Sequence, residues 1–356
     1  MKHLLSIAAV SGLTFLYSCT GKREHPRRLN DIRIIGSHNS YKIAIEPALW
    51  QIIYREDSNR AKALQYEHIP ISEQLDLGLR NLELDILHDP MGGRYTQPAG
   101  LELVRQTGAD PLPYDPDGEL EMPGLKVFHI PDIDFRSHQL LFAEALREIN
   151  DWSDRHTDHI PIIITLNAKD SGVDREGFTL PLPFSTSALD SIDLEIRQVI
   201  PQEKLITPDL VRGDAQTLET AVRSDGWPLL EEIKGRFLFV LDEKGNKQQH
   251  YIQGHPSLKG RVMFVNADPG TPEAAFLIMN DPVKDSGKIK NLVKQGYMIR
   301  TRADAGTTEA REINYDRFRA ALESGAQVIT TDYYIPSKLF RSTYKVEFEE
   351  GGFAIQ

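Results

Sequence analysis

The first residues with obvious chemical potential are a histidine and an amide that follow one another, His38 and Asn39. Both lie in a Gly-Ser-His-Asn-Ser-Tyr stretch, residues 36–41, directly after a short apolar run at 32–35 that is typical of a buried strand. A proton-transfer group and an oxygen ligand delivered together at a strand end indicate an active site. The alternative is a polar turn in which one of the serines caps a helix.

Two carboxylates follow in a second strand-like run, residues 80–87, where Glu83 and Asp85 alternate with leucine and isoleucine. Side chains alternate between the two faces of a strand, so both carboxylates share one face and the apolar side chains share the other. We therefore expect the apolar face to contact helices and the carboxylates to point into a barrel. A solvated edge strand is the alternative, but the strongly apolar opposite face disfavours it.

Polar side chains also close several later apolar runs. A single example has a structural explanation, because a lone histidine is often a hydrogen-bonded core residue and Arg300 with Asp304 could form a buried ion pair. Convergence of many such residues at the same end of successive strands favours an active site, which in barrels of alternating strands and helices lies at the carboxyl ends of the strands. The residues are His129, Thr165, Asn167, Lys169, Arg300, Arg302, Asp304, Asp332 and Tyr333.

The oxygen-bearing side chains Asn39, Glu83, Asp85 and Asn167 indicate a hard metal ion. Carboxylate and amide oxygens are the ligands of Ca²⁺, with Mg²⁺ as the alternative. The sequence has no Cys-x-x-Cys or His-Glu-x-x-His pattern, which disfavours a structural or protease-type zinc site.

Two histidines, His38 and His129, remain outside this ligand set. Histidine titrates near neutrality, so one could act as general base and the other as general acid. Basic side chains such as Lys169 and Arg302 could neutralise charge on phosphorus oxygens while protons move. Together these residue types indicate chemistry on a phosphodiester.

Eight short apolar runs supply the strands that would position these residues. Several are almost continuously apolar, as strands buried on both faces should be. Helical patterns fill most gaps, at 139–152, 187–200, 214–233 and 315–324. This alternation predicts a single-domain (β/α)8 TIM barrel, and a doubly wound sheet is the alternative. The runs are residues 31–36, 80–87, 125–130, 161–168, 236–243, 261–268, 297–303 and 326–333.

Two connections depart from an ideal barrel. The segment 88–124 is rich in Gly, Pro and Asp and has no periodicity, so we expect a long irregular loop that forms part of an active or binding site. The crossover at 43–79 is also long, with helices expected at 45–64 and 72–77. Gly78 is expected to end the second of these helices.

Residues 1–18 are predicted to be a lipoprotein-type signal peptide. Lys2 precedes an apolar run at 4–16 that is too short to span a bilayer comfortably. Leu-Tyr-Ser-Cys then resembles a bacterial lipobox, and Cys19 is the only cysteine of the chain. We expect Cys19 to carry lipid, residues 19–30 to form a basic tether, and the exported protein to be a membrane-anchored lipoprotein of the periplasm, outer membrane or cell surface. An ordinary secretory signal peptide with an incidental cysteine is the alternative.

The composition is that of a globular protein, with 40% hydrophobic and 26% charged residues. A formal net charge of −11 argues against a nucleic-acid-binding protein, which would carry a basic face. An acidic protein is not strongly attracted to anionic membranes either, so contact with a membrane would depend on the lipid anchor. We expect a monomer.

Several of these stretches resemble the phosphatidylinositol-specific phospholipase C superfamily, and its bacterial calcium-dependent branch in particular. The resemblance covers most of the chain after residue 30. It implies that residues 31–356 form a (β/α)8 barrel that cleaves the bond between glycerol and phosphoinositol. The matching stretches are residues 36–41, 82–85, 127–129, 300–304, 325–327 and 331–333.

The resemblance also implies roles for individual residues. His38 and His129 would be the catalytic histidines, and Asn39, Glu83 and Asp85 would ligate calcium. In the family mechanism the inositol 2-hydroxyl attacks phosphorus. His129 would then stabilise the pentavalent phosphorus, and His38 would protonate the leaving glycerol oxygen.

Asn167 departs from the family pattern, because calcium-dependent members usually have a glutamate at this position. An amide still ligates a metal but removes one negative charge, so either calcium binds more weakly or Asn167 is not a ligand. Lys169, Arg302, Asp332 and Tyr333 are expected to bind the substrate, a phospholipid or a glycerophosphodiester.

Two other functions remain open. A glycerophosphodiester phosphodiesterase shares the barrel and the Glu-x-Asp pair, but that family normally begins with His-Arg-Gly where this chain has His-Asn-Ser at residues 38–40. The other is a surface lipoprotein without enzymatic activity that holds a sugar or lipid head group. The intact histidines and carboxylates count against it.

Overall fold

The computed structural model describes residues 26–224 and 226–355 of the 356-residue chain. The predicted signal peptide, the predicted lipid attachment site Cys19 and most of the predicted tether lie outside the described residues. The end of that tether, in contrast, already belongs to the fold. Leu29 is fully buried, and its backbone N–H donates to the carbonyl of Pro228 over 3.0 Å. The packed chain therefore begins before residue 31.

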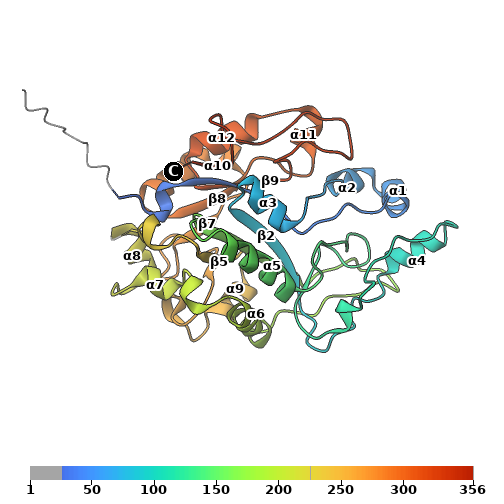
Figure 1. The fold of residues 1–356 in the computed structure, drawn as a ribbon, viewed down its shortest axis with the longest axis horizontal. Coiled ribbons are helices and arrows are strands. Elements are labelled where there is room, and N and C mark those ends of the chain that lie inside the picture. Colours follow the sequence, from blue (N-terminus) through green and yellow to red (C-terminus); the bar gives the residue numbers. More distant parts are fainter. Residues whose placement is uncertain (1–25, 225, 356) are drawn as a thin grey trace, which may run out of the picture.

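Eight parallel strands form a nearly closed barrel with helices around it, which confirms the predicted fold class (Figure 1). Neighbouring strands follow the order β6-β5-β4-β2-β1-β9-β8-β7, and a parallel bridge between Asn266 and Phe276 links the two ends of this order. The barrel strands are β1 (Arg33–Ser37), β2 (Asn81–Leu87), β4 (Ile162–Ala168), β5 (Phe237–Leu241), β6 (Phe264–Val265), β7 (Phe276–Ile278), β8 (Met298–Arg302) and β9 (Val328–Thr331).

The strands form where the sequence is apolar on both faces. Every residue of β5 is buried, and in β4 only Asn167 is partly exposed. The surrounding helices bury one apolar stripe each against these strands, as Leu146 and Ile149 do in the helix α5. The helices are α1 (Pro47–Glu56), α2 (Ser58–Ala63), α3 (Ile71–Leu77), α4 (Ala99–Arg105), α5 (Phe142–Arg155), α6 (Thr186–Val199), α7 (Pro208–Arg212), α8 (Leu218–Ser224), α9 (Asn246–Ile252), α10 (Pro282–Lys294), α11 (Thr308–Glu312) and α12 (Asp316–Ser324).

The prediction that residues 125–130 form a strand of the barrel was wrong. Only β3 (Lys126–Val127) forms there, and it pairs antiparallel with the end of β2. A short apolar run has the same appearance whether its partner is parallel or antiparallel, so the sequence pattern could not separate the two cases. The missing parallel strand is β7, whose three residues are too few to give a periodic signal.

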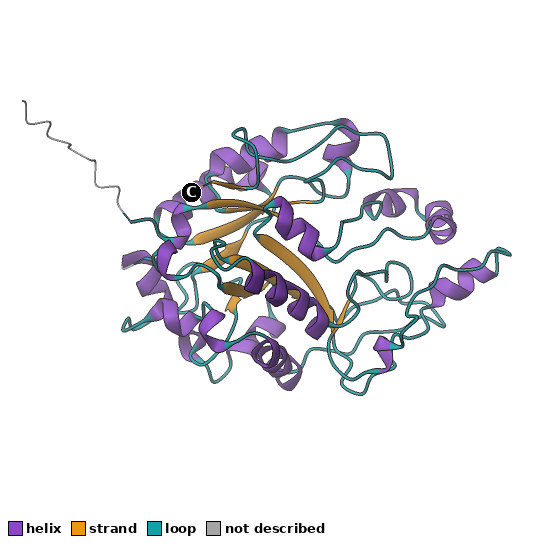
Figure 2. Ribbon diagram, viewed as in Figure 1, coloured by secondary structure: helices purple, strands orange, loops and turns teal. Residues whose placement is uncertain are grey.

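The connection after β2 is long and mostly irregular, as predicted, and it contains α4 and a short 3-10 turn at Glu119–Glu121. Figure 2 shows this segment and the connection that carries α1 and α2 extending from the same side of the strands. The helix predicted at 214–233 is shorter, because it is limited to α8 and a second 3-10 turn at Leu230–Glu232. Gly78 ends α3 with a positive φ of 105°, as predicted.

The last strand of the described chain pairs with the first strand of the barrel. The short strand β10 (Ala354–Ile355) pairs antiparallel with β1, at Arg33 and Ile34. In the portion of the chain that the structure describes, we find no helix with the length and apolar character needed to cross a membrane.

Candidate active site

The turn after β1 places His38 between two barrel strands. Gly36 approaches β2 so closely that a Cβ atom on it would lie 2.3 Å from the carbonyl oxygen of Asn81, so only glycine fits. Two residues further along the chain, the backbone N–H of His38 donates to the carbonyl of Thr331 in β9 over 3.1 Å. The glycine of the sequence pattern thus allows the strand contact that fixes the histidine.

The imidazole of His38 is held by a carboxylate from the far end of the chain. Its Nδ1 lies 2.9 Å from Oδ1 of Asp332, which follows β9. Because a carboxylate accepts, Nδ1 carries a proton, and Nε2 faces the barrel interior, 3.6 Å from Oε1 of Glu83. The guanidinium of Arg302 lies 3.3 Å from both ring nitrogens. Burial, and then the positive charge of Arg302, lowers the pKa of His38 well below its usual value.

Asp332 is itself held in place by Asp304. The backbone N–H of Asp332 donates to Oδ1 of Asp304 over 2.9 Å, and the hydroxyl of Thr331 donates to Oδ2. On its other side Asp332 accepts a hydrogen bond of 3.3 Å from Arg302. Burial, together with the nearby charge of Asp332, raises the pKa of Asp304 to about 7. One network behind His38 therefore joins four residues at the ends of β8 and β9, namely Arg302, Asp304, Thr331 and Asp332.

His129 has a buried carboxylate of its own, five residues further along the chain. Its Nδ1 lies 2.8 Å from Oδ2 of Asp134, and Lys42 donates to Oδ1 of the same carboxylate over 2.5 Å. The side chains of Lys42 and Asp134 are completely buried. Burial would raise the pKa of Asp134, but the charges of Lys42 and His129 outweigh it and lower this pKa below its ordinary value. Asp134 therefore stays ionised and leaves Nε2 as the free nitrogen of His129.

Glu83 and Asp85 face the barrel interior as the strand pattern predicted, and each has a basic partner. Oε2 of Glu83 accepts from Arg300, and Oε1 accepts from the amide of Asn167 over 2.9 Å. Oδ2 of Asp85 lies 3.4 Å from Nζ of Lys169. The alternative explanation of Arg300, an ion pair with Asp304, does not apply, because the side chain of Arg300 contacts Glu83. Each predicted carboxylate thus lies beside a cation, and Glu83 also accepts from an amide.

The oxygens beside these carboxylates fit a hard metal ion. Asn39 has a left-handed backbone with a φ of 49°, and its amide nitrogen donates to the hydroxyl of Tyr66 over 2.7 Å. This leaves its Oδ1 buried with no hydrogen-bond partner, and a cation would satisfy such an oxygen. Residues 26–224 and 226–355 contain no group of three or more His, Cys, Asp or Glu side chains placed to hold a metal. A calcium site here therefore needs amide oxygens beside the two carboxylates.

One predicted substrate-binding residue lies elsewhere. The ring of Tyr333 packs edge-on against Phe340 and Tyr344, in an apolar cluster outside the barrel. Sequence reasoning in turn missed Lys42 and Asp134. The position of Asp134 five residues after His129 was a usable signal, whereas nothing near Lys42 in the sequence indicates a buried lysine.

Comparison with known families identifies one that covers almost all of the described chain. A family model described as Ca²⁺-dependent phosphoinositide phospholipase C matches residues 27–355. A search of curated protein sequences gave no match.

Two solved structures share the fold. The calcium-dependent phosphoinositol-specific phospholipase C of a Gram-negative Pseudomonas species, in a myo-inositol complex, is 17% identical with a TM-score of 0.52 and covers 88% of this chain and 94% of its own. The Ca²⁺-dependent phosphatidylinositol-specific phospholipase C of Streptomyces antibioticus is 18% identical with a TM-score of 0.52, covering 88% and 98%.

Proposed function

Since the chain belongs to the Ca²⁺-dependent phosphoinositide phospholipase C family, whose members are phosphoric diester hydrolases, we propose that it cleaves the glycerol–phosphate bond of a phosphoinositide. One observation carries this proposal. His38 and His129 each bind a buried carboxylate through Nδ1, which leaves the two Nε2 atoms for substrate. The two rings are also close enough for a charge on His129 to lower the pKa of His38.

The two histidines have different tasks in the proposed reaction. The inositol 2-hydroxyl attacks phosphorus, and the bond from phosphorus to the glycerol oxygen breaks. His129 stabilises the pentavalent phosphorus. His38, whose unprotonated Nε2 accepts the proton of the 2-hydroxyl, delivers that proton to the departing glycerol oxygen. Arg302, directly beside His38, neutralises charge on the phosphorus oxygens. Asp332 and Asp134 keep each imidazole in one tautomer and one orientation.

Asn39, Glu83 and Asp85 would hold the calcium ion, which when bound supplies positive charge beside the phosphate. The glutamate that family members have at the position of Asn167 is absent, and the amide of Asn167 donates to Glu83. We propose that this amide orients Glu83, and that the site binds calcium more weakly than a site with a third carboxylate would.

A panel of phospholipids and glycerophosphodiesters, assayed with and without calcium, tests the substrate class. We expect calcium-dependent release of an inositol phosphate from phosphatidylinositol. Equal turnover of glycerophosphodiesters whatever their head group would favour a glycerophosphodiester phosphodiesterase. Absence of turnover on the whole panel would favour a binding protein without enzymatic activity.

Calcium dependence has a direct test in the two carboxylates. The Glu83→Gln, Asp85→Asn double variant should lose calcium binding in calorimetry together with activity, because ligand charge sets the affinity of a calcium site. Full activity of the wild type in excess chelator, or of the double variant, would contradict the proposed metal role. Asn167→Glu is the reverse test, and it should tighten calcium binding if residue 167 is a ligand.

We further propose that the protein is exported and anchored by lipid at Cys19. The grounds are the sequence of the first 19 residues and the single cysteine. In a bacterial host, Cys19→Ser should move the protein from the membrane fraction to the soluble fraction. Unchanged fractionation would exclude an anchor at this position.

A further inference from the structure

Arg300 lies between two carboxylates in the barrel interior. Its Nη2 donates to Oε2 of Glu83, and its Nη1 lies 3.8 Å from Oδ2 of Asp242, which follows β5. The side chain of Arg300 is only 1% exposed, so its charge cannot turn into solvent. A buried guanidinium needs a negatively charged acceptor. Glu83 and Asp242 are the two carboxylates that can supply it.

The contact with Arg300 occupies a carboxylate that is also a candidate calcium ligand. Oε1 of Glu83 accepts from the amide of Asn167 over 2.9 Å, and Oε2 accepts from Arg300, so both oxygens already have a donor. The guanidinium repels a second cation at the same carboxylate. Because Glu83 is only 3% exposed, little water is present to screen this repulsion. Arg300 and a calcium ion therefore compete for Glu83.

Asp242 is placed to accept the guanidinium when it leaves Glu83. Its Oδ1 accepts a hydrogen bond of 3.0 Å from the amide of Asn266, and Oδ1 of Asn266 accepts from the backbone N–H of Ile278 over 3.0 Å. These bonds fix the carboxylate beside Arg300. An ordinary N–H···O bond measures about 2.9 Å, so Nη1 of Arg300 needs to approach Oδ2 by about 1 Å to form one. Nε of Arg300 is buried without a partner, so the guanidinium lacks a full set of acceptors where it lies.

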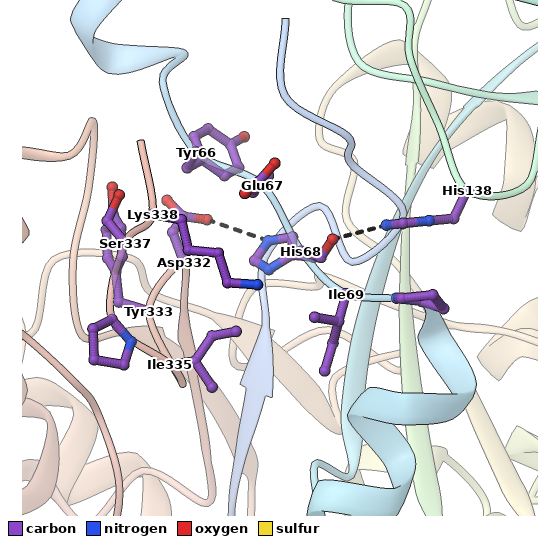
Figure 3. A pocket seen from close by; sticks show the side chains of 12 residues that line it. Tyr66, Glu67, His68, Ile69, His138, Asp332, Tyr333, Ile335, Ser337 and Lys338 are labelled. Carbon is purple, nitrogen blue, oxygen red and sulfur yellow. Dashed lines mark hydrogen bonds and ion pairs between the residues drawn. The ribbon is translucent and has the colours of Figure 1, made fainter. Parts of the chain in front are cut away.

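The other basic side chains near the candidate ligands do not share this position. Lys169 lies 3.4 Å from its carboxylate, but its side chain is 29% exposed and can extend into solvent. Arg302 shares one face of β8 with Arg300, yet it donates to Asp332 over 3.3 Å. Figure 3 shows Asp332 beside His68 in the wall of a cavity of about 250 Å³, and Asp332 is not a candidate metal ligand. The competition is therefore specific to Arg300.

We propose that Arg300 is an internal competitor for the calcium site, and that Asp242 is a positioning residue, which accepts the guanidinium when calcium binds Glu83. Arg300 compensates the charge of Glu83 without the metal, and Asp242 makes its release easier. Because binding free energies are linked, whatever holds Arg300 on Glu83 weakens calcium binding to the same extent. This competition rests on the proposed role of Glu83 as a calcium ligand, and it does not depend on the identity of the substrate.

Calorimetric titration with calcium chloride tests the competition without any turnover. Arg300→Met removes the guanidinium but fills much of its space, so Kd for calcium should fall about tenfold. Calcium should also raise the Tm of this variant more than that of the wild type, because the metal then compensates a buried carboxylate that has lost its partner. If Arg300→Met does not fold, Arg300→Gln gives the same comparison, since its neutral amide can still donate to Glu83.

Lys247→Met is the matched control for removal of a positive charge. Lys247 contacts Asp170 and Glu243 and has no contact with Glu83. Its substitution should leave Kd for calcium unchanged. Tightening equal to that in Arg300→Met would show that net charge, rather than the contact with Glu83, sets the affinity, and would overturn the competition.

Asp242→Asn tests the acceptor. Its amide oxygen can still accept from Asn266, but the charge that attracts the guanidinium is lost, so Kd for calcium should rise about tenfold. In the Arg300→Met background the same substitution should change Kd much less, because no guanidinium remains to be released. Asp242→Glu, which restores the charge, should recover most of the affinity. A direct calcium ligand at Asp242 would instead give equal losses in both backgrounds, which would overturn its positioning role.

Glu83→Gln separates the competition from the metal role itself. Weaker calcium binding in Glu83→Gln, together with an unchanged Kd in Arg300→Met, would overturn the competition and leave the metal role intact. Calcium binding in Glu83→Gln that equals that of the wild type would overturn both.

Discussion

The two histidines of the candidate active site are held in place by different kinds of contact. His38 and Asp332 are 294 residues apart, but they follow neighbouring parallel strands, in which Ser37 and Thr331 are paired. The barrel backbone therefore fixes both groups before any side chain interacts. His129 and Asp134 are five residues apart and lie outside the barrel sheet, after the antiparallel strand β3.

The His129 turn is held by local contacts. The backbones of Ile130 and Asp134 exchange two hydrogen bonds of 3.0 Å, which close the turn. Within it Asp132, with a φ of 70°, accepts hydrogen bonds from the backbone of Ala99 and of Thr179. The buried ion pair between Lys42 and Asp134 links this segment to the turn after β1, as do backbone hydrogen bonds from His138 to Tyr41 and from Ile43 to Arg136. One histidine is thus positioned by strand pairing, and the other by local turn contacts together with a buried ion pair.

Removal of either imidazole should have the largest effect on kcat. His38→Ala and His129→Ala should each lower kcat by about 10²–10⁴ while the protein stays folded, because each ring moves protons or charge in the same step. The double variant should lose less than the product of the two losses. Turnover of phosphatidylinositol together with circular dichroism measures both properties. No loss in either variant would remove this pair from the mechanism.

Substitution of Asp134 or Asp332 tests more directly how each histidine is held in place. Asp134→Asn leaves Lys42 as a buried charge without its counterion, so it should cost about 3–5 kcal/mol in the free energy of unfolding. Asp332→Asn should cost less, because strand pairing continues to hold that segment. Urea denaturation compares the two variants. The Lys42→Met, Asp134→Asn double variant is the control, and it should regain stability without regaining activity. Equal destabilisation by the two single variants would contradict the comparison.

The smallest expected effect distinguishes the role proposed for His38, protonation of the leaving oxygen, from that proposed for His129, stabilisation of the pentavalent phosphorus. If His38 protonates the leaving oxygen, an activated aryl phosphodiester needs that proton less than the natural diester does. The ratio of wild-type to variant kcat should then shrink more for His38→Ala than for His129→Ala when the aryl substrate replaces the lipid. Steady-state rates on both substrates provide the measurement, and equal recovery of the two variants would refute this division of roles.

The sequence predicted the His38 region better than the His129 region, for a physical reason. Period-two alternation placed Glu83 and Asp85 on the inner face of β2, and the apolar run before His38 placed it at a strand end. Both patterns depend only on local chain geometry. The same reasoning placed His129 on a barrel strand, which was wrong, because the direction of pairing of β3 depends on a partner that the local sequence does not identify.

Contacts between side chains that are far apart in the sequence also could not be predicted. Lys42 pairs with Asp134 across 92 residues, and Arg300 pairs with Glu83 across 217. Charged residues at such separations carry no periodic signal. The packing of Tyr333 against Phe340 and Tyr344 was not predictable for a related reason, since an aromatic residue after a strand can pack outward as easily as inward.

The pairing of β1 with β9 makes the order of folding matter for activity. During synthesis, a chain that ends before residue 328 already contains Glu83, Asp85 and both histidines, but it lacks the strand that seats Asp332 beside His38. Contacts of such sequence separation form late, because closing a long loop costs entropy before the contact compensates for it. Partly folded chains should therefore be catalytically inactive, and the onset of catalysis should report closure of the barrel. A stopped-flow refolding experiment that follows turnover alongside fluorescence would time this step.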